Sequence, residues 1–270
     1  MFDLIAEMLS YQFLVRAAAV GLLVSLCAAL LGVSLVLRRY SMIGDGLSHV
    51  GFGALSAAMA MGASPLSLSI PVVVAAAVIL LRTTGENCIK GDTAIGLISV
   101  SSLAIGITAV SVSSGINTDV CNYMFGSILA MSRSDVRLCL FTSAGVLALF
   151  ALCYHRIFAV TFDETFARAS GVNTELCSTT IAVLTGVTIA VGMRLMGALL
   201  ISGLIVFPSV TSMRMFKSFR GVAISSAAVA VSSFLIGLIA SYALGTPTGA
   251  SIVLVNLLFF AVFTAAGRMK

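Results

Sequence analysis

The segment 221–267 contains no charged residue, and this feature constrains the fold more than any other. As one α-helix, at about 1.5 Å per residue, it would be roughly 70 Å long, more than twice the ~30 Å hydrocarbon core of a bilayer. It must therefore fold back, and the turn-forming run GTPTG at residues 245–249 predicts where. The uncharged segment 50–81 is likewise too long for one crossing, and the run GASP at residues 62–65 divides it.

Composition places the whole chain in a membrane. It is 60% hydrophobic and 9% charged, with a mean hydropathy of +1.15, whereas soluble domains carry about 25% charged residues. The first residues, MFDLIAEMLSYQ, lack a basic region and a cleavage site, so we expect the first apolar run to remain as a span. The 6 cysteines form no CxxC pair and are interpreted as packing residues.

Charges that bound the apolar runs predict an all-α, polytopic transmembrane helical bundle of about nine spans, each roughly 20 residues long. The predicted spans are residues 17–37, 43–62, 65–81, 94–117, 138–154, 176–193, 196–213, 221–243 and 248–267. An eight-span alternative would need one re-entrant segment to keep the charges segregated. We expect a single transmembrane domain over residues 1–270.

The basic residues support this topology, because cytoplasmic loops of membrane proteins are enriched in Lys and Arg. With the N-terminus outside and the C-terminus in the cytoplasm, the outer loops hold only Arg16, Arg133, Arg137 and Arg194. The remaining Lys and Arg residues all fall on the cytoplasmic side. Basic loops and anionic lipid headgroups account for the net charge of +5, so it indicates no nucleic-acid partner.

Asp45 and His49 lie four residues apart in RRYSMIGDGLSHVGFGALSA, so one helical turn would place both side chains on the same face. If the helix began at Arg39, it would rise roughly 15 Å to His49, close to the membrane midplane. Ionisable residues at such a depth are rare and usually functional. We interpret the pair as a cation site. In the alternative reading, Asp45 caps the helix N-terminus and His49 bonds a neighbouring carbonyl.

A carboxylate and an imidazole suit zinc, manganese and ferrous iron, whereas oxygen cages suit calcium and thiolates suit copper(I). Two ligands per chain are too few for a tight tetrahedral site. This number fits a transient station in a transport path, or a site that a second copy completes. The metal would be cargo, and no permanently bound cofactor is expected.

The segment 156–175 is the longest predicted cytoplasmic connection, and we expect it to form a short amphipathic helix that ends at Gly171. Phe162 and Phe166 would form one apolar ridge, with Glu164 and Arg168 on a charged face. Such a ridge is typical of a helix that enters a groove on a partner. The alternative is a solvated loop without a partner.

These residues resemble the membrane permease subunits of bacterial ATP-binding-cassette importers for manganese, zinc and iron. The resemblance rests on the loop that contains Asp45 and His49, and on five further motifs in the same order along the chain. They are GDTAIGL at 91–97, YMFGSILAMSRSDV at 123–136, FDETFARASGV at 162–172, RLMGALLISGLIVFPSVTSMR at 194–214 and GTPTGASIVL at 245–254.

The resemblance implies a type II importer fold in the bacterial cytoplasmic (inner) membrane, and a homodimer or a dimer with a close paralogue. Asp45 and His49 would hold zinc, manganese or iron in transit. An extracytoplasmic metal-binding protein would deliver the metal, and cytoplasmic ATPase subunits would drive import. The resemblance also implies an ATPase-coupling helix formed by Phe162, Asp163, Glu164, Phe166, Ala167, Arg168 and Gly171.

The sequence contains no Walker A motif, so the chain is expected to transport rather than to hydrolyse ATP or act as an enzyme. The runner-up is a secondary cation transporter driven by proton or sodium exchange, with Asp45 as the proton-coupled ligand. An intramembrane hydrolase is disfavoured, because the chain has no HExxH motif and only 2 histidines. The choice between zinc, manganese and iron stays open.

Overall fold

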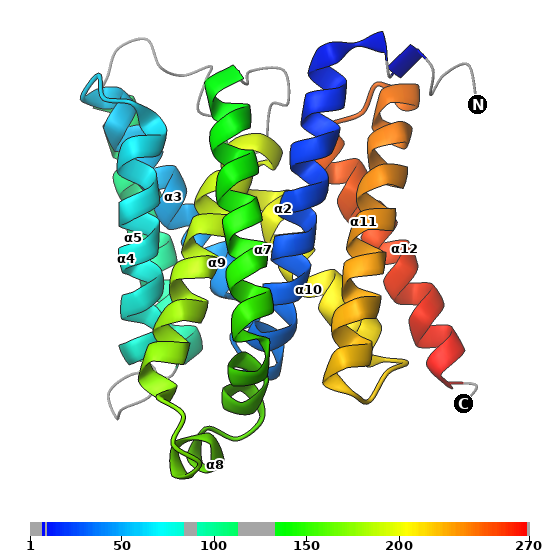
Figure 1. The fold of residues 1–270 in the computed structure, drawn as a ribbon. Coiled ribbons are helices and arrows are strands. Elements are labelled where there is room, and N and C mark those ends of the chain that lie inside the picture. Colours follow the sequence, from blue (N-terminus) through cyan, green and yellow to red (C-terminus); the bar gives the residue numbers. More distant parts are fainter. Residues whose placement is uncertain (1–6, 9, 84–90, 113–132, 269–270) are drawn as a thin grey trace.

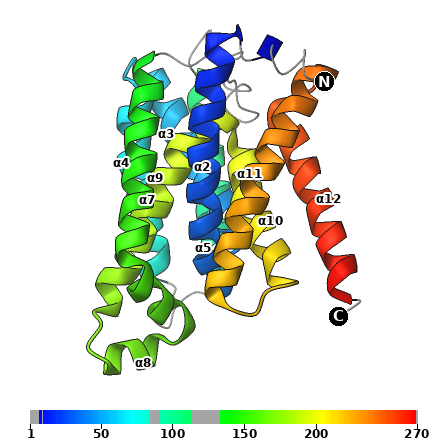
Figure 2. The same cartoon turned by 45° about the vertical axis from the view of Figure 1, so that its right-hand side comes forward.

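A computed structural model describes residues 7–8, 10–83, 91–112 and 133–268, and in these ranges the chain is helical without strands. The helices run side by side in one bundle, with the short α8 beyond one end (Figures 1 and 2). We call this end, which also carries the C-terminus, the α8 end. The elements are α2 (Gln12–Leu37), α3 (Ile43–Ala60), α4 (Pro65–Thr83), α5 (Gly91–Val112), α7 (Arg133–Phe162), α8 (Glu164–Ala169), α9 (Thr174–Met196), α10 (Ala198–Met213), α11 (Phe219–Leu244) and α12 (Thr248–Arg268).

Within the described ranges, 6 helices are long and apolar enough to cross a membrane. They show an integral, multi-pass membrane protein. Each predicted span falls on a helix, but α3 is not among the 6, and the apolar segments Leu66–Arg82 and Ala198–Met213 are shorter. The count of about nine spans therefore stays a prediction. The two chain ends lie at opposite ends of the bundle (Figure 1).

Both predicted reversals are confirmed. α11 ends at Leu244, Gly245 adopts a left-handed conformation with φ of 63°, and α12 begins at Thr248. α3 ends at Ala60, Gly62 has φ of 67°, and α4 begins at Pro65. Glycine suits these two positions because it lacks the Cβ that disfavours positive φ. Proline suits the start of α4 because the first N–H groups of a helix have no intrahelical acceptor.

α2 lies at the centre of the bundle and packs against α7, α9, α10 and α11. It reaches α10 at Gly32, where an added Cβ would overlap the carbonyl oxygen of Ile205. Two buried serines strengthen the contact: Ser209 of α10 and Ser226 of α11 each donate a hydrogen bond to the Ala29 carbonyl, at 3.4 and 3.3 Å. Small residues and interhelical hydrogen bonds are the usual means of helix association in a bilayer.

The described cysteines, Cys27, Cys139, Cys153 and Cys177, are free, as expected for packing residues. Cys27, Cys139 and Cys177 are buried, and Cys153 is half-buried. Cys88 and Cys121 lie outside the described residues.

The α2–α10 contact predicts that Gly32→Ala destabilises the protein, by about 1–3 kcal/mol as is typical of overpacking, because backbone atoms must separate. Gly145→Ala in α7 is the matched control, since nothing lies within 4 Å of its added Cβ. The control should raise helix stability by about 0.5–1 kcal/mol. Thermal unfolding of the two variants in the same detergent measures the difference. Equal unfolding temperatures would contradict the proposed contact.

Candidate functional site

Glycines allow α3 to approach three neighbouring helices closely. At four glycines of α3, an added Cβ would lie at or inside van der Waals distance of an atom on the facing helix. These contacts are Gly44 to Ile205 Cδ1 of α10 (3.1 Å), Gly46 to Ile95 Cγ2 of α5 (2.6 Å), Gly51 to Met193 Cε of α9 (2.7 Å) and Gly53 to the Ser102 carbonyl oxygen of α5 (2.6 Å). The neighbours therefore fix the rotation of α3 about its axis.

This rotation leaves Asp45 and His49 on the face of α3 between the side turned to α10 and the side turned to α5. His49 Nε2 lies 3.7 Å from Asp45 Oδ2, so the predicted convergence of the two side chains is confirmed. The Asp45 side chain is 53% exposed and that of His49 is 21% exposed. Both therefore remain accessible to an ion, to water or to a second copy of the chain.

The structure rejects the capping alternative for Asp45. The N-cap of α3 is Met42, and Asp45 lies in the first turn, where its charge favours the helix dipole. The predicted helical rise of roughly 15 Å is wrong, because residues 38–42 form a turn and the helix begins only at Ile43. His49 lies six residues beyond this start, so the helical rise is about 9 Å.

α2 ends in a Schellman motif, which explains the late start of α3. Tyr40 N–H donates to the Leu35 carbonyl at 2.8 Å, and Arg39 N–H donates to the Val36 carbonyl at 3.0 Å. Arg39 itself has φ of 65°, a left-handed conformation that glycine usually occupies. The chain therefore needs residues 38–42 to turn before α3 can begin.

No group of three or more His, Cys, Asp or Glu side chains gathers anywhere in the described part of the chain. Among the residues whose side chains the structure describes, no third ligand of these types joins Asp45 and His49. Ser48 does not add one, because it is buried and donates its hydroxyl to the Gly44 carbonyl at 2.7 Å. Its oxygen also lies 3.4 Å from Ser202 Oγ, which links α3 to α10.

The structure brings three of the sequence motifs together around this pair. Gly46, beside Asp45, meets Ile95 of GDTAIGL. Gly44 and Ser48 meet Ile205 and Ser202, which belong to the motif at 194–214. Most of the motif at 123–136 lies outside the described residues. The pair is therefore held by segments that are roughly 50 and 160 residues away in the chain.

The second candidate site, the coupling segment, is built by two side-chain caps. Asp163 accepts a hydrogen bond from the Phe166 N–H at 2.8 Å and begins α8, which is 6 residues long. Asn173 accepts one from the Leu176 N–H at 3.0 Å and begins α9. Between them, Gly171 has φ of 83°. The predicted short helix is confirmed, with its end at Ala169 and the turn at Gly171.

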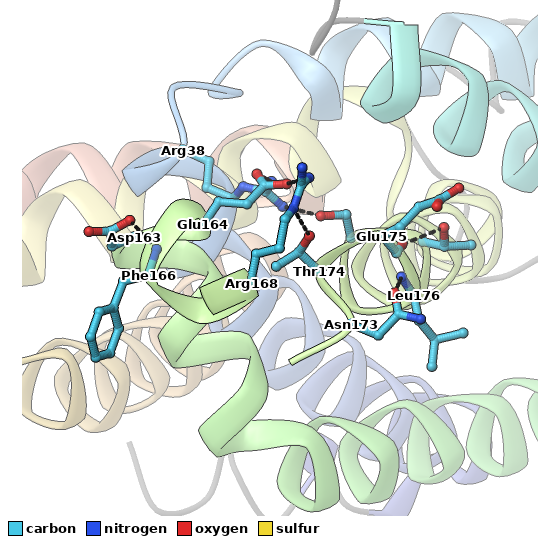
Figure 3. Close-up of polar contacts among 11 residues, drawn as sticks. Arg38, Asp163, Glu164, Phe166, Arg168, Asn173, Thr174, Glu175 and Leu176 are labelled. Atoms are coloured by element: carbon cyan, nitrogen blue, oxygen red, sulfur yellow. Dashed lines mark hydrogen bonds and ion pairs between the residues drawn. The ribbon is translucent and has the colours of Figure 1, made fainter. Parts of the chain in front are cut away.

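The predicted ridge of Phe162 and Phe166 on one helix is wrong. Asp163 has an extended backbone, with φ of −149°, so Phe162 ends α7 while Phe166 belongs to α8. The Phe162 ring packs beside Phe158 and Phe219, with centroid distances of 5.1 and 6.0 Å. Phe166 is 68% exposed, and its ring points away from the ion pairs of α8 (Figure 3). Ala167 is buried and faces the bundle.

Ion pairs join α8 to the rest of the bundle (Figure 3). Glu164 Oε2 lies 3.1 Å from Arg38 Nη2, and Glu164 Oε1 lies 3.7 Å from Arg168 Nη2. Arg38 also donates to Ser178 Oγ of α9 at 3.1 Å. Since Arg38 immediately follows α2, it connects α2, α8 and α9.

Sequence reasoning missed the ion pairs of Arg38 and Arg82 and used both residues only as markers of topology. Arg82, in the last turn of α4, pairs with Glu175 Oε1 at 3.1 Å, in the first turn of α9. From the sequence alone, a basic residue at a helix end could pair with any of the chain's 10 acidic residues. No signal in a single sequence identifies the carboxylate that each one meets.

Comparison with known proteins places these observations in a family. The model of the ABC 3 transport family matches residues 10–266. A protein of Treponema pallidum, named as a probable metal transport system membrane protein, is 31% identical over 97% of this chain and 100% of its own length. The manganese import system permease protein ScaB of Streptococcus gordonii is 27% identical, over 93% of this chain and 90% of its own.

A solved structure with a similar fold supports the same family. The solved structure of PsaBC from Streptococcus pneumoniae in complex with Fab is similar to this chain, with a TM-score of 0.85 and 27% identity. The similarity covers 97% of this chain and 94% of that one. Sequence and fold therefore agree over almost the whole length. The chain belongs to the ABC 3 transport family, as a membrane permease and not as an enzyme.

Proposed function

We propose that this chain is the permease subunit of an ATP-driven importer that passes zinc, manganese or iron across the bacterial cytoplasmic membrane. The carrying observation is the Asp45–His49 pair, which is accessible on α3 and has ligand types that suit these metals. The relatives named above are metal and manganese transport proteins, which supports the same cargo class. The alternative of a secondary transporter has no comparable support, since the matched family is an ABC transport family.

The proposed assembly is a dimer of two such chains around one metal path. One chain offers two ligands, and a second copy would offer the same two again. The total of four ligands is the number that a transition-metal ion commonly takes from protein. A path between two copies also gives the partly exposed Asp45 carboxylate a polar neighbour inside the membrane. Few ligands per chain suit an ion that must be released.

The proposed topology has nine spans, with the N-terminus outside and the α8 end in the cytoplasm. Arg38, Arg82 and Arg168 all lie at the α8 end, in agreement with the enrichment of basic residues in cytoplasmic loops. In this orientation, α8 and Phe166 face the compartment that contains ATP. We therefore assign the segment 156–175 to coupling with a separate ATPase, and the opposite end to the extracytoplasmic metal donor.

The metal path predicts that Asp45→Ala and His49→Ala each reduce metal uptake to the level of cells without the transporter. The reason is the loss of one of two ligands on an already sparse site. Asp45→Asn, which keeps the side-chain size, should behave like Asp45→Ala. Thr142→Ala is the control, because it removes a polar side chain from α7, outside α3, and should leave uptake unchanged. Wild-type uptake by the double alanine variant would refute the site, provided that all variants reach the membrane equally.

Ligand hardness gives a second prediction. His49→Asp replaces an imidazole by a carboxylate and should shift the preferred cargo toward harder ions such as manganese, relative to zinc. Competition between isotopically labelled manganese and unlabelled zinc measures the preference in whole cells. An unchanged ratio with retained uptake would show that His49 does not contact the metal.

The coupling segment predicts that Phe166→Ala weakens ATPase association by about tenfold to a hundredfold, because a buried aromatic ring contributes about 1.5–3 kcal/mol. Glu164→Arg should weaken it as well, since it replaces the ion pair with Arg38 by repulsion and displaces α8. Leu176→Ala is the matched control, an exposed apolar residue at the same end of the bundle. Copurification of the ATPase with each variant measures the effect.

Crosslinking provides an independent check of the same proposal. Single cysteines at positions 161–171 are introduced one at a time and crosslinked to the ATPase in native membranes. At least the positions around Phe166 should crosslink. If none does so in an assembled complex, or if the segment reacts only with reagents added from outside, the coupling role is refuted.

A further inference from the structure

A groove with a volume of about 680 Å³ runs between α7 and α11, with Leu30 of α2 among its lining residues. Each flanking helix contributes a continuous stripe of side chains. On α7 the stripe includes Phe150 and Tyr154, and on α11 it includes Ile224 and Ala227. Residues four apart on one helix point the same way, so each stripe forms one wall of the groove.

The groove has a polar end and an apolar end. His155 and Arg220 line it toward the α8 end, where Arg220 is the second residue of α11. Ile224 and Ala227 continue the wall deeper into the bundle. From Arg220 to Ala227 the helix rises about 10 Å, which is less than the ~15 Å of one leaflet of the hydrocarbon core. The groove is therefore short enough to hold a headgroup at its polar end and the first part of an acyl chain along its wall.

The charge of the polar end is not compensated within the described part of the chain. Neither Arg220 nor His155 has a carboxylate partner among the described residues, and no acidic residue lines the groove. Arg38, Arg82 and Arg168, at the same end of the bundle, are each paired with a glutamate. A positive end that opens into an apolar groove favours a molecule with an anionic head and a hydrocarbon tail.

The groove is also separate from the candidate metal path. Asp45 and His49 lie on α3, which packs against α4, α5, α9 and α10. The groove is formed by α7, α11 and α2, which lie on the near side of the bundle in Figure 1, while α3 lies behind them. An occupant of the groove would therefore bind the outer surface of the bundle and would not block transit of the ion.

We propose that this groove binds one anionic phospholipid from the leaflet at the α8 end. The phosphate contacts Arg220 and His155, and an acyl chain lies along Ile224 and Ala227. A small soluble anion would leave the apolar walls uncovered. Ile224, with 61% of its surface exposed, would gain a partner from the acyl chain. The site goes beyond the proposed transport function and does not depend on which metal is carried.

Native mass spectrometry of the full chain tests the proposal. The protein is extracted in detergent and mixed with phosphatidylglycerol and phosphatidylethanolamine of identical acyl chains. The wild type should retain phosphatidylglycerol preferentially. Arg220→Gln should lower this retention about fivefold, the factor expected for one basic residue near an anionic headgroup. Arg220→Lys should preserve it. Lys217→Gln is the control, because it removes the same charge three residues away, outside the groove.

A second pair of variants tests the apolar wall without changing any charge. Ala227→Phe fills the groove and should reduce the retention of both lipids, whereas Ala228→Phe, one residue on and outside the lining, should not. Equal retention of phosphatidylglycerol by the wild type and Arg220→Gln would overturn the proposal. So would its displacement by glycerol 3-phosphate, which would indicate a site for small anions. Efficient disulfide crosslinking of Ile224→Cys between two copies would assign the groove to a second chain instead.

Discussion

The close approach of helix backbones at small residues is the constraint on which the rest of this structure depends. In a bilayer, lipid tails are as apolar as leucine, so helices associate through tight packing and hydrogen bonds rather than through burial from water. Gly32 lets α10 lie directly against α2, and Ser209 and Ser226 both donate to the Ala29 carbonyl at that contact. The position of α10 thus depends on its contact with α2 and not on the candidate functional residues.

The same principle positions the candidate metal pair. α3 is held on the α10 side at Gly44, on the α5 side at Gly46 and on the α9 side at Gly51. At Gly46 an added Cβ would lie 2.6 Å from Ile95 Cγ2 next to the α5 backbone, whereas at Gly44 and Gly51 it would displace the ends of the Ile205 and Met193 side chains. Because the remaining face carries Asp45 and His49, the accessibility of the pair follows from the packing of the glycines on the other faces of α3.

At the α8 end, the turn between α2 and α3 has two consequences. It ends α2 at Leu37 and delays the start of α3 to Ile43, which reduces the helical rise to His49. It also places Arg38 where the guanidinium reaches both Glu164 of α8 and Ser178 of α9. The segment that contains α8 and the helix that carries Asp45 and His49 are therefore attached to the two sides of one short turn.

The sequence alone was sufficient for the local features: the all-helical class, the reversals at Gly62 and Gly245, and the convergence of Asp45 and His49. Each depends on residues within about one or two helical turns, where hydropathy, glycine and side-chain spacing act directly. Tertiary structure decided which helices meet, that Arg38 pairs with Glu164, and that Phe162 joins Phe219 instead of Phe166. These contacts join segments far apart in the chain or depend on a cap that interrupts a helix. Their free energy comes from the packing of the complete bundle, which no local pattern contains.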